Sequence, residues 1–355
     1  MKAAAALLVV VAALALAATV QASFYFTVED LESDEALWEL YGRWAAHHGA
    51  VREPGRFAAF KANARMLHGK QRHAGEPMAL NVFGDLTFDE FTAKTACLKP
   101  THRRDLEEEV PYIDLELDPI FATRAAALPS SVDWRSEYAV TPVKDQGGCG
   151  CCWAFATAGA VEGLDAIKSQ AMAVSLSAQF LLDCTYPYVD KTSDCAGGSR
   201  YAALDLIKKH GGIPTDTLWP YKGYRSRCDT SQFYSSATVS EYFRLQKFNA
   251  TILKMAVSLQ PISVSIAVND DIRFWDPKVR GNVYYGPFNT DKVTHGVLIV
   301  GYDVDDLGAP YWIVKNSWGA TWGAEGYINI NAAASDGFVG KSGVAGILTN
   351  AIFMK

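Results

Sequence analysis

The segment 146–155 holds three cysteines within four positions, Cys149, Cys151 and Cys152, and these residues are suited to covalent chemistry. A helix N-terminus lowers the pKa of a cysteine below its free value of about 8.5 and so favours the nucleophilic thiolate. The apolar residues that follow have helical spacing and are Trp153, Ala156, Ala160, Leu164 and Ile167. This pattern places Cys152 in the first helical turn as a candidate nucleophile. The simpler alternative is a small buried side chain.

A cysteine nucleophile generally needs a neighbouring base, and histidine is the usual one. Of the seven histidines, only His210 and His295 lie beyond residue 128. His210 ends a predicted helix, where the helix dipole favours a cation, so a structural role is sufficient to explain it. His295 stands just before the apolar run 297–300, at the start of a predicted strand. We therefore expect His295 to be the base.

A third side chain is expected to orient the imidazole. Asn316 follows the predicted strand 311–314 and precedes Trp318 by two residues. The Asn316 amide oxygen can accept the ring N–H, and the indole would keep water away from that hydrogen bond. Taken alone, Asn316 is more simply a turn residue. The assignment therefore depends on Cys152, His295 and Asn316 coming together.

These three residues must be positioned by helices in the first half of the compact region and by strands in the second half. The predicted helices begin near Trp153, at Leu176 with Ser177 as N-cap, and at Tyr201, with Gly211 ending the last one. The predicted strands cover 262–268, 297–300, 311–314 and 326–330. Helices followed by strands predict an α+β fold of two lobes with a cleft between them.

The chain of 355 residues, 49% of them hydrophobic, is long enough for several units. Residues 1–22 have a basic start, an apolar core and small residues near Ala22, which predicts a secretory signal peptide; a membrane anchor is the alternative. Helical patterns follow over 31–73, with a break at Pro54–Gly55, and 80–85 is expected to form a short strand and turn. A composition shift near residue 128 predicts the start of the compact domain.

Charge is unevenly distributed along the chain. Residues 1–127 hold 13 Lys and Arg against 18 Asp and Glu, and the acidic run 105–118 is typical of a solvated linker. The formal net charge of -6 gives no reason to expect a nucleic-acid partner, which normally needs a basic face. No cofactor or metal is expected either, because the spacing of Cys149, Cys151 and Cys152 is too tight for a tetrahedral site without a fourth ligand.

The order of the segments 146–155, 293–296 and 315–319 resembles that of the papain-like cysteine proteases, and the resemblance extends from about residue 31 onward. It implies a papain-like two-lobe α+β fold with a helical N-terminal lobe and an antiparallel β-barrel-like C-terminal lobe. A helical inhibitory propeptide would precede it. The implied division is a signal peptide at 1–22, a propeptide at 23–127 and a peptidase domain at 128–355.

The first part of the chain also resembles the propeptide of this family. Residues that match its inhibitory helix are Arg56, Phe60, Asn63 and Leu67, and those that match its second motif are Asn81, Phe83 and Asp85. The chain departs from the pattern at Arg52 and Gln71, where Glu and Asn are usual. The resemblance implies that this segment covers the cleft as an intramolecular inhibitor. We expect acid to release it by protonating carboxylates.

The resemblance implies an endopeptidase with Cys152 as nucleophile, His295 as base and then acid, and Asn316 as the residue that orients the imidazole. The Gln146 side chain and the Cys152 backbone N–H would stabilise the oxyanion, with about 3 kcal/mol from each donor. Protein and peptide substrates would pair with the backbone of Gly197 and Gly198. The implied pocket for the second residue before the cut is formed by Ser199, Tyr201, Val293, Gly296 and Asn350.

Ser199 and Arg200 replace the larger apolar residues or proline of many relatives, which favours an open, partly polar pocket for acidic or polar side chains. The simpler expectation is that Arg200 points into solvent. The family pattern also implies disulfides between Cys149 and Cys195 and between Cys184 and Cys228. Cys151 is then left over, either as an inert residue or as the partner of Cys152 in a reversible bond formed on oxidation.

The sequon at Asn249 fits a secretory route that ends outside the cell or in a vacuole or lysosome. We expect a monomer with no membrane contact once the signal is removed. Two rival functions remain open from the sequence. The first is a non-catalytic binding or storage protein, which would be expected to lack Cys152 or His295. The second is a peptide ligase that uses the same three residues.

Overall fold

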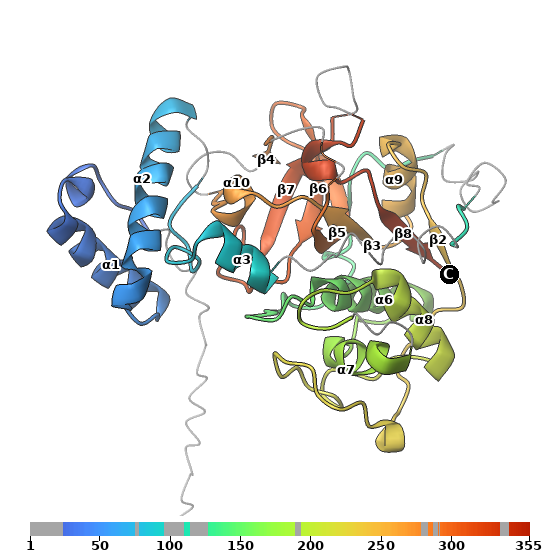
Figure 1. Cartoon of the computed structure of the whole chain (residues 1–355). Helices are drawn as coiled ribbons and strands as arrows, with labels where there is room; N and C mark the ends of the chain where they lie inside the picture. Colours follow the sequence, from blue (N-terminus) through green and yellow to red (C-terminus); the bar gives the residue numbers. More distant parts are fainter. Residues whose placement is uncertain are drawn as a thin grey trace, which may run out of the picture.

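The computed structural model describes residues 24–74, 78–95, 110–113, 127–188, 193–277, 283–286, 290, 292–333 and 341–355. The predicted signal peptide and nearly all of the acidic run therefore lie outside the described residues. None of the described helices is both long enough and apolar enough to cross a lipid bilayer. Figure 1 shows a helical pair at one side, a sheet in the middle and a second group of helices beneath the sheet.

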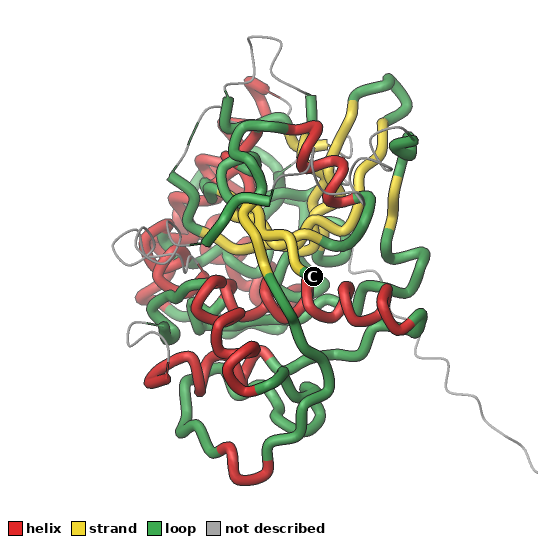
Figure 2. Tube along the Cα trace, turned by 90° about the vertical axis from the view of Figure 1, so that its right-hand side faces the viewer, coloured by secondary structure: helices red, strands yellow, loops and turns green. Residues whose placement is uncertain are grey.

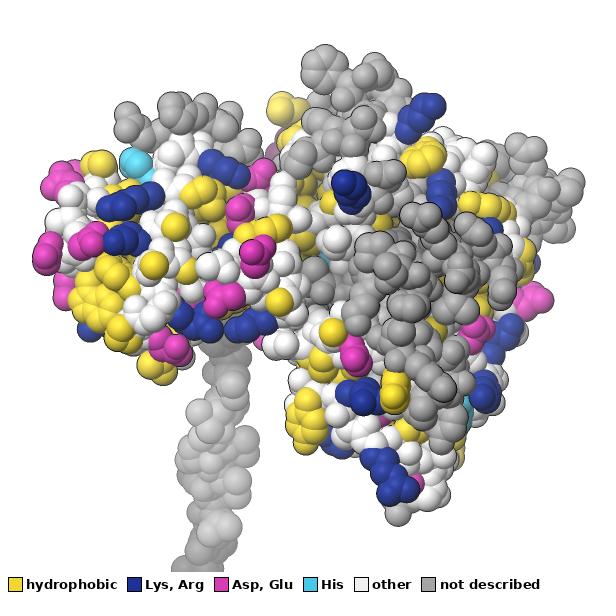
Figure 3. Space-filling view, in the orientation of Figure 1, with side chains coloured by type: hydrophobic (Ala, Val, Ile, Leu, Met, Phe, Trp, Pro, Cys, Tyr) yellow, Lys and Arg dark blue, Asp and Glu magenta, His cyan; other side chains and the backbone are white. Residues whose placement is uncertain are grey.

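The helical pair consists of α1 (Asp34–His48) and α2 (Phe57–Ala74), preceded by the short 3-10 helices η1 (Glu29–Leu31) and η2 (Pro54–Arg56). Gly49 ends α1 with a φ of 63°, a conformation that glycine adopts without strain. The two helices lie side by side and share their own core, which contains Leu40, Tyr41, Trp44, Phe60 and Leu67. Basic and acidic side chains are interspersed over this pair on the face shown in Figure 3.

The strand predicted near 80–85 is wrong, although the turn is present. Residues 82–85 form a turn, because the Gly84 N–H donates to the Asn81 carbonyl and Asn63 donates to the Gly84 carbonyl. Helix α3 (Phe88–Thr95) follows, and the sequence prediction missed it. Its start is stabilised by a capping box in which Thr87 and Glu90 exchange hydrogen bonds.

The helical lobe contains α6 (Cys152–Ser169), α7 (Ala178–Tyr188) and α8 (Arg200–His210), which pack on one another around one apolar core. All three helices were predicted, the first from apolar spacing, the second with Ser177 as its N-cap and the third with Gly211 at its end. Ser177 caps α7 as expected, since its hydroxyl accepts the Phe180 N–H at 2.9 Å. Gly211 ends α8 with a φ of 72°. The strong local signals of capping and periodicity explain why these elements were predictable.

The sheet lobe contains one eight-stranded sheet, whose main path runs β2-β8-β3-β5-β6-β7-β4, with β1 on β5. The strands are β1 (Val132–Asp133), β2 (Tyr242–Arg244), β3 (Ile262–Ile266), β4 (Val283–Tyr284), β5 (His295–Val304), β6 (Pro310–Lys315), β7 (Tyr327–Asn331) and β8 (Ala351–Met354). The short helices α9 (Ala250–Val257), α10 (Asp270–Arg273), η3 (Thr230–Gln232) and η4 (Val344–Gly346) complete the described elements. Figure 2 shows the strands gathered above most of the helices.

The described strands are antiparallel except for β4 and β7, which pair in parallel. Among these strands the sheet does not close, so the barrel-like lobe that we expected is an open sheet. The two end strands, β2 and β4, have only three and two residues, and such short edges cannot pair along the length of a barrel. The papain-like two-lobe architecture with a helical segment before it is otherwise as predicted.

Helix α6 lies at the seam between the two lobes. A Cβ atom on Gly163 would come within 2.5 Å of Pro261, and one on Gly159 within 3.0 Å of Leu298. These glycines let the helix backbone approach the sheet lobe closely. The N-terminus of α6 therefore lies against the start of β5, where Cys152 and His295 stand.

Candidate active site

Cys152 is the first residue of α6, and its side chain is fully buried. The loop before it is fixed by hydrogen bonds from the Gln146 N–H to the Ser317 carbonyl and from the Gly150 N–H to the Cys195 carbonyl. From the sheet lobe, the Gly296 N–H donates to the Cys152 Sγ at 3.0 Å. The sulfur thus receives a hydrogen bond from the opposite lobe and stands at the positive end of the helix dipole.

His295 begins β5, and Asn316 immediately follows the neighbouring strand β6. Antiparallel pairing of Leu298 with Lys315 brings the two side chains to the same edge of the sheet. The His295 Nε2 lies 2.8 Å from the Asn316 Oδ1, which also accepts the Ser317 N–H at 2.8 Å. Because Oδ1 is an acceptor, Nε2 carries the proton, and Nδ1 is the remaining acid–base position.

Trp318 covers this histidine, with ring centroids 4.6 Å apart. His295 and Trp318 are both almost inaccessible to solvent. Burial lowers the pKa of His295 to about 4, although the hydrogen bond to Asn316 acts in the opposite direction. The imidazole is therefore neutral at ordinary pH while the site is covered, so the thiolate and imidazolium pair is not the state of this covered site.

Gln146 is fully buried beside the nucleophile. Its Oε1 accepts the Ser317 hydroxyl at 2.7 Å, and its Nε2 donates to the Cys149 carbonyl at 2.9 Å. These two contacts fix the orientation of the amide. The same Nε2 also points at the Thr95 carbonyl oxygen, 3.3 Å away.

The Thr95 carbonyl belongs to the segment before the compact domain, and it contacts two of the predicted catalytic residues. Its oxygen lies 3.2 Å from the His295 Nδ1 and 3.3 Å from the Gln146 Nε2. Helix α3, which ends at Thr95, is held in place by Phe91, whose ring packs on Trp318 with centroids 5.2 Å apart. A peptide carbonyl is thus presented to the predicted base and the predicted oxyanion donor.

The cysteines divide into several states. Cys149 is bonded to Cys195 and Cys184 to Cys228, the pairing that the resemblance implied. Cys152 is also disulfide-bonded. Because Cys149 is in a disulfide, the three clustered cysteines do not form a metal site.

Cys151 is the free thiol among the described cysteines. Burial raises the pKa of Cys151 to about 12, although its contact with the Tyr221 hydroxyl, 3.1 Å away, lowers it. A thiol with such a pKa is almost entirely protonated and unreactive. It is not bonded to Cys152, so the Cys151–Cys152 disulfide that the sequence left open is absent here.

The glycine pair predicted to meet the substrate lies against α6. A Cβ on Gly198 would come within 2.4 Å of the Trp153 ring, so no larger residue fits there. Gly197 has a φ of 124° and exchanges backbone hydrogen bonds with Asp194. Ser199 follows as the N-cap of α8, since its hydroxyl accepts the Ala202 N–H at 3.3 Å.

The other predicted pocket residues come from the two lobes and are all buried, namely Tyr201, Val293, Gly296 and Asn350. The Tyr201 hydroxyl donates to the Asn350 Oδ1 at 3.1 Å and joins the lobes. The expectation that Arg200 points into solvent is wrong. Its side chain is only 3% exposed and turns inward toward Asn350, because buried polar atoms there hold the guanidinium.

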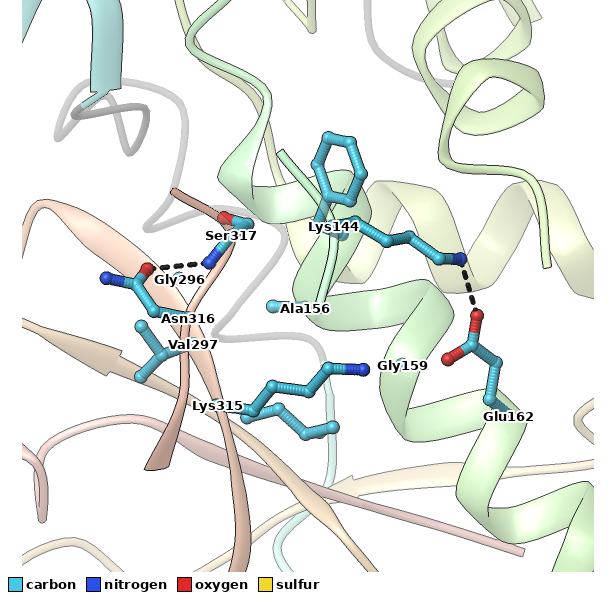
Figure 4. A pocket seen from close by; sticks show the side chains of 11 residues that line it. Lys144, Ala156, Gly159, Glu162, Gly296, Val297, Lys315, Asn316 and Ser317 are labelled. Atoms are coloured by element: carbon cyan, nitrogen blue, oxygen red, sulfur yellow. Dashed lines mark hydrogen bonds and ion pairs between the residues drawn. The ribbon is translucent and has the colours of Figure 1, made fainter. Parts of the chain in front are cut away.

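A buried charge network that the sequence prediction missed lies behind the site. The Glu162 carboxylate accepts hydrogen bonds from Lys144, Thr141 and the Leu176 N–H at 2.6 to 2.8 Å. Burial raises the pKa of Glu162, but Lys144 and Lys315 more than offset it, so the net direction is down. Lys144, Glu162, Lys315 and Asn316 are among the residues that line an interlobe cavity of about 30 Å³. Figure 4 shows these side chains. Lys315, the last residue of β6, donates to Thr141, so the network links α6 to the strand that immediately precedes Asn316.

Asn249 lies away from these residues, at the N-terminus of α9. Its Oδ1 accepts the Ile252 N–H at 3.0 Å, and the residue is partly exposed. The Nδ2 atom, to which a glycan would be attached, is therefore on the opposite side of the amide from the Oδ1 atom that caps the helix.

Comparison with known proteins identifies the family. The family model described as "Papain family cysteine protease" matches residues 128–351. The chain is 39% identical to vignain of Vigna mungo over 349 residues, which cover 96% of this chain and 91% of that protein. It is 40% identical to cysteine endopeptidase Rep1 of Oryza sativa subsp. japonica over 337 residues, which cover 91% of this chain and 86% of that protein.

Solved proforms have the same fold. The proform of the Amb a 11 cysteine protease of ragweed pollen superimposes with a TM-score of 0.81 at 34% identity, covering 94% of this chain and 98% of that one. A recombinant stem bromelain precursor gives a TM-score of 0.75 at 32% identity, with coverage of 90% and 98%. Both matches include the segment before the compact domain. The chain belongs to the papain family of cysteine proteases and is a cysteine endopeptidase with a pro-segment.

Proposed function

We propose that this chain is an inhibited zymogen that, once processed, hydrolyses peptide bonds through Cys152, His295 and Asn316. The observation that carries the proposal is the contact of one peptide carbonyl, that of Thr95, with both the His295 Nδ1 and the Gln146 Nε2. A substrate carbonyl beside the nucleophile would accept a hydrogen bond from the same Gln146 amide, and the leaving amine of the scissile bond would lie near the His295 Nδ1. The pro-segment thus inhibits by occupying the place of a substrate.

In the proposed reaction the Cys152 thiolate attacks the carbonyl carbon of the scissile bond and forms a tetrahedral intermediate. The oxyanion accepts hydrogen bonds from the Gln146 side chain and from the backbone N–H of Cys152, which lies in the first turn of α6. His295 returns the proton from Nδ1 to the leaving amine. Water, deprotonated by the same nitrogen, then hydrolyses the thioester.

Asn316 keeps Nδ1 available for this role by holding Nε2–H. Trp318 excludes water from the hydrogen bond between His295 and Asn316, which strengthens it. Once the pro-segment leaves and Cys152 is a thiol, the helix dipole favours the thiolate, and a thiolate favours protonated His295. The thiolate and imidazolium pair expected from the sequence is therefore proposed for the uncovered site.

The proposed substrate path runs along the predicted substrate-binding residues. An extended peptide would pair with the backbone of Gly197 and Gly198, which is held close against the Trp153 ring because Gly198 has no side chain. The side chain of the second residue before the cut would enter the pocket of Ser199, Tyr201, Val293, Gly296 and Asn350.

We also propose the division into a signal peptide at 1–22, a pro-segment at 23–127 and a peptidase domain at 128–355. The signal-like start, the disulfides Cys149–Cys195 and Cys184–Cys228, and the sequon at Asn249 support a secretory route to the exterior or to a vacuole or lysosome. The proposed mature enzyme is a monomer without a cofactor. Hydrolysis is proposed in preference to ligation, and amine nucleophiles added to the assay would distinguish the two.

The first test uses the processed, reduced enzyme and a dipeptidyl fluorogenic substrate, with and without an epoxide that alkylates active thiolates. We expect turnover that the epoxide abolishes. Gln146→Ala should lower kcat about 100-fold with little change in KM, because the lost donor acts on the oxyanion. Ser317→Ala should have a smaller effect, since it only loosens the Gln146 amide. A folded Gln146→Ala enzyme with kcat near that of the wild type would contradict the assignment.

Acid release of the pro-segment has a candidate sensor in His48 of α1. Its ring nitrogen contacts the Leu80 carbonyl at 3.0 Å, and burial lowers the pKa of His48 to about 4. The free histidine titrates near 6.5. These described contacts of His48 lie within the pro-segment, so as pH falls from about 6.5 to 4 the unfolded segment takes up a proton that the folded segment does not. The fold of the segment, on which its docking depends, therefore loses stability over this window, by about 1 to 2 kcal/mol once partial exposure is considered.

The sequence had suggested carboxylates as the sensors of acid, but the pKa values of the pro-segment carboxylates shift in opposite directions. Burial raises the pKa of Asp85, so acid favours its docked form, whereas the hydrogen bond from Lys61 lowers the pKa of Asp34. We expect His48→Gln to flatten the pH dependence of zymogen processing between pH 6.5 and 4, measured by gel in the presence of reductant. His47→Gln is the matched control. Equal steepness in the wild type and His48→Gln would contradict the role of His48.

A further inference from the structure

One tyrosine hydroxyl contacts both ends of the loop that carries the two proposed oxyanion donors. The loop runs from Gln146, whose side-chain amide is one donor, to Cys152, whose backbone N–H is the other. The Tyr221 hydroxyl lies 2.7 Å from the Gln146 carbonyl oxygen and 3.1 Å from the Cys151 Sγ. Gln146 and Cys151 are both inaccessible to solvent. A single oxygen therefore joins the first residue of the loop to the residue before the nucleophile.

The direction of each hydrogen bond in this cluster follows from the chemistry of the three groups. The Gln146 carbonyl can only accept, so the single Tyr221 proton is donated to it. The Cys151 thiol must then donate its own proton to the Tyr221 oxygen. Burial raises the pKa of Tyr221 and that of Cys151, so both groups keep their protons. The result is a directed chain from the Cys151 S–H through the Tyr221 O–H to the Gln146 carbonyl.

The loop needs such a contact because its backbone is permissive. Three of the five residues between Gln146 and Cys152 are glycines, and one of them, Gly147, has a φ of 58°. The Cys149–Cys195 disulfide holds the middle of this loop. The Tyr221 hydroxyl holds its two ends, and these are the parts that carry the donors.

Gln146 is held from both lobes. On the side of the sheet lobe, the Ser317 carbonyl accepts the Gln146 N–H at 2.9 Å, and the Ser317 hydroxyl donates to the Gln146 Oε1 at 2.7 Å. On the side of the helical lobe, the Tyr221 hydroxyl donates to the Gln146 carbonyl. Tyr221 is therefore the counterpart of Ser317 in the other lobe.

Tyr221 is itself fixed on the helical lobe. The Ser177 hydroxyl donates to the Trp219 carbonyl at 2.6 Å, and the peptide N–H that follows Tyr221 donates to the Gln179 Oε1 at 2.8 Å. Helix α7 thus holds the chain on either side of Tyr221. The Tyr221 ring packs edge-on against Phe155 of α6, with centroids 4.9 Å apart. A packed ring therefore carries the hydroxyl from a fixed backbone to the loop.

We propose that Tyr221 is a positioning residue for the reaction, which sets the spacing between the Gln146 amide and the Cys152 backbone N–H. An oxyanion is stabilised by donors that are in place before the charge develops, and a displacement of about 1 Å can cost about 100-fold in rate. Loss of the hydroxyl loosens both donors and removes neither. The inference rests on the proposed function, because it concerns the oxyanion site of the same reaction.

Tyr221→Phe tests the proposal, because it keeps the ring on Phe155 and removes only the hydroxyl. With processed, reduced enzyme, we expect kcat for a dipeptidyl fluorogenic substrate to fall about tenfold with little change in KM. A peptide aldehyde, whose adduct with Cys152 places an oxygen in the oxyanion site, should bind about tenfold more weakly. After removal of the reductant, the rate at which Cys152 reacts with a small aromatic disulfide should not change, since that exchange forms no oxyanion.

The competing explanation is that the hydroxyl only stabilises the helical lobe. A general distortion would slow the disulfide reaction together with peptide hydrolysis, and that result would overturn the proposal. Tyr242→Phe is the matched control, because it removes another partly buried hydroxyl, which donates to Asp205 at 2.6 Å from the edge strand β2. We expect its kcat and its affinity for the aldehyde to equal those of the wild type.

A double variant tests whether Tyr221 acts through Gln146. Because Gln146→Ala removes a donor that Tyr221 positions, adding Tyr221→Phe should lower kcat further by less than about threefold. A full tenfold loss in that background would overturn the proposal, as would unchanged kcat and aldehyde affinity in Tyr221→Phe that circular dichroism shows to be folded. No turnover by the wild-type enzyme, with no epoxide labelling, overturns the proposed function instead.

Discussion

Cys152→Ala is expected to reduce peptide hydrolysis to the uncatalysed background, a loss of more than about 10⁴-fold in kcat. The sulfur is the atom that forms the thioester, and neither His295 nor Gln146 can replace it. The variant should still fold, because Cys152 is a small residue and the helical lobe keeps its disulfides Cys149–Cys195 and Cys184–Cys228. Turnover of a fluorogenic dipeptide and circular dichroism measure the two properties.

Cys151→Ala is the matched control, since it removes a neighbouring thiol from the same turn. Burial raises the pKa of Cys151 to about 12, so it contributes no thiolate, and its loss should change kcat only a few-fold. The contact with the Tyr221 hydroxyl is lost, which should cost a modest amount of stability. Retained hydrolysis in Cys152→Ala, or abolished hydrolysis in folded Cys151→Ala, would reverse the roles of the two cysteines.

The parts of the fold that could be predicted are those with local signals. Apolar spacing predicted α6, and the N-cap Ser177 and the terminal Gly211 marked ends of α7 and α8 that the structure bears out. Alternation of Ile262, Val264 and Ile266 gave β3. The contact between His295 and Asn316 followed from elimination among the histidines and from the order of motifs, rather than from any measure of distance.

Other features depend on packing between distant segments, which the sequence does not encode locally. The position of Thr95 is set by Phe91 on Trp318, more than 200 residues away along the chain. The capping box of Thr87 and Glu90 could have revealed α3, but not where it docks. The inward direction of Arg200 depends on two serines of β3 that look unremarkable in the sequence.

The aromatic cover of His295 links inhibition to catalysis. The Trp318 ring packs on His295. It also packs on the rings of Phe83 and Phe91 of the pro-segment, with centroid distances of 5.8 and 5.2 Å. The pro-segment therefore docks on the same indole that shields the catalytic hydrogen bond. The docked pro-segment packs against the catalytic residues and also occupies the place of a substrate. The arrangement of Cys152, His295 and Asn316 is therefore already formed before processing.

Removal of the pro-segment is not expected to be sufficient for activity, because Cys152 is disulfide-bonded. A sulfur in a disulfide has no thiolate to attack a carbonyl. A dithiol reductant would cleave this bond by thiol–disulfide exchange, which yields the Cys152 thiol and a second protein thiol while the reductant becomes a disulfide. The other described cysteines are accounted for. Cys149 is bonded to Cys195, Cys184 is bonded to Cys228, and Cys151 is a free thiol.

We therefore expect acid-treated zymogen without reductant to show no epoxide labelling of Cys152 and no turnover, and both to appear after mild dithiol treatment. Intact-mass and peptide mass spectrometry before and after reduction measure the change. Cys151→Ser, as the control, should keep the requirement for reductant. Full labelling of the unreduced wild type would show that the nucleophile is stored as a thiol, and that the pro-segment blocks it through the contacts of Thr95 alone.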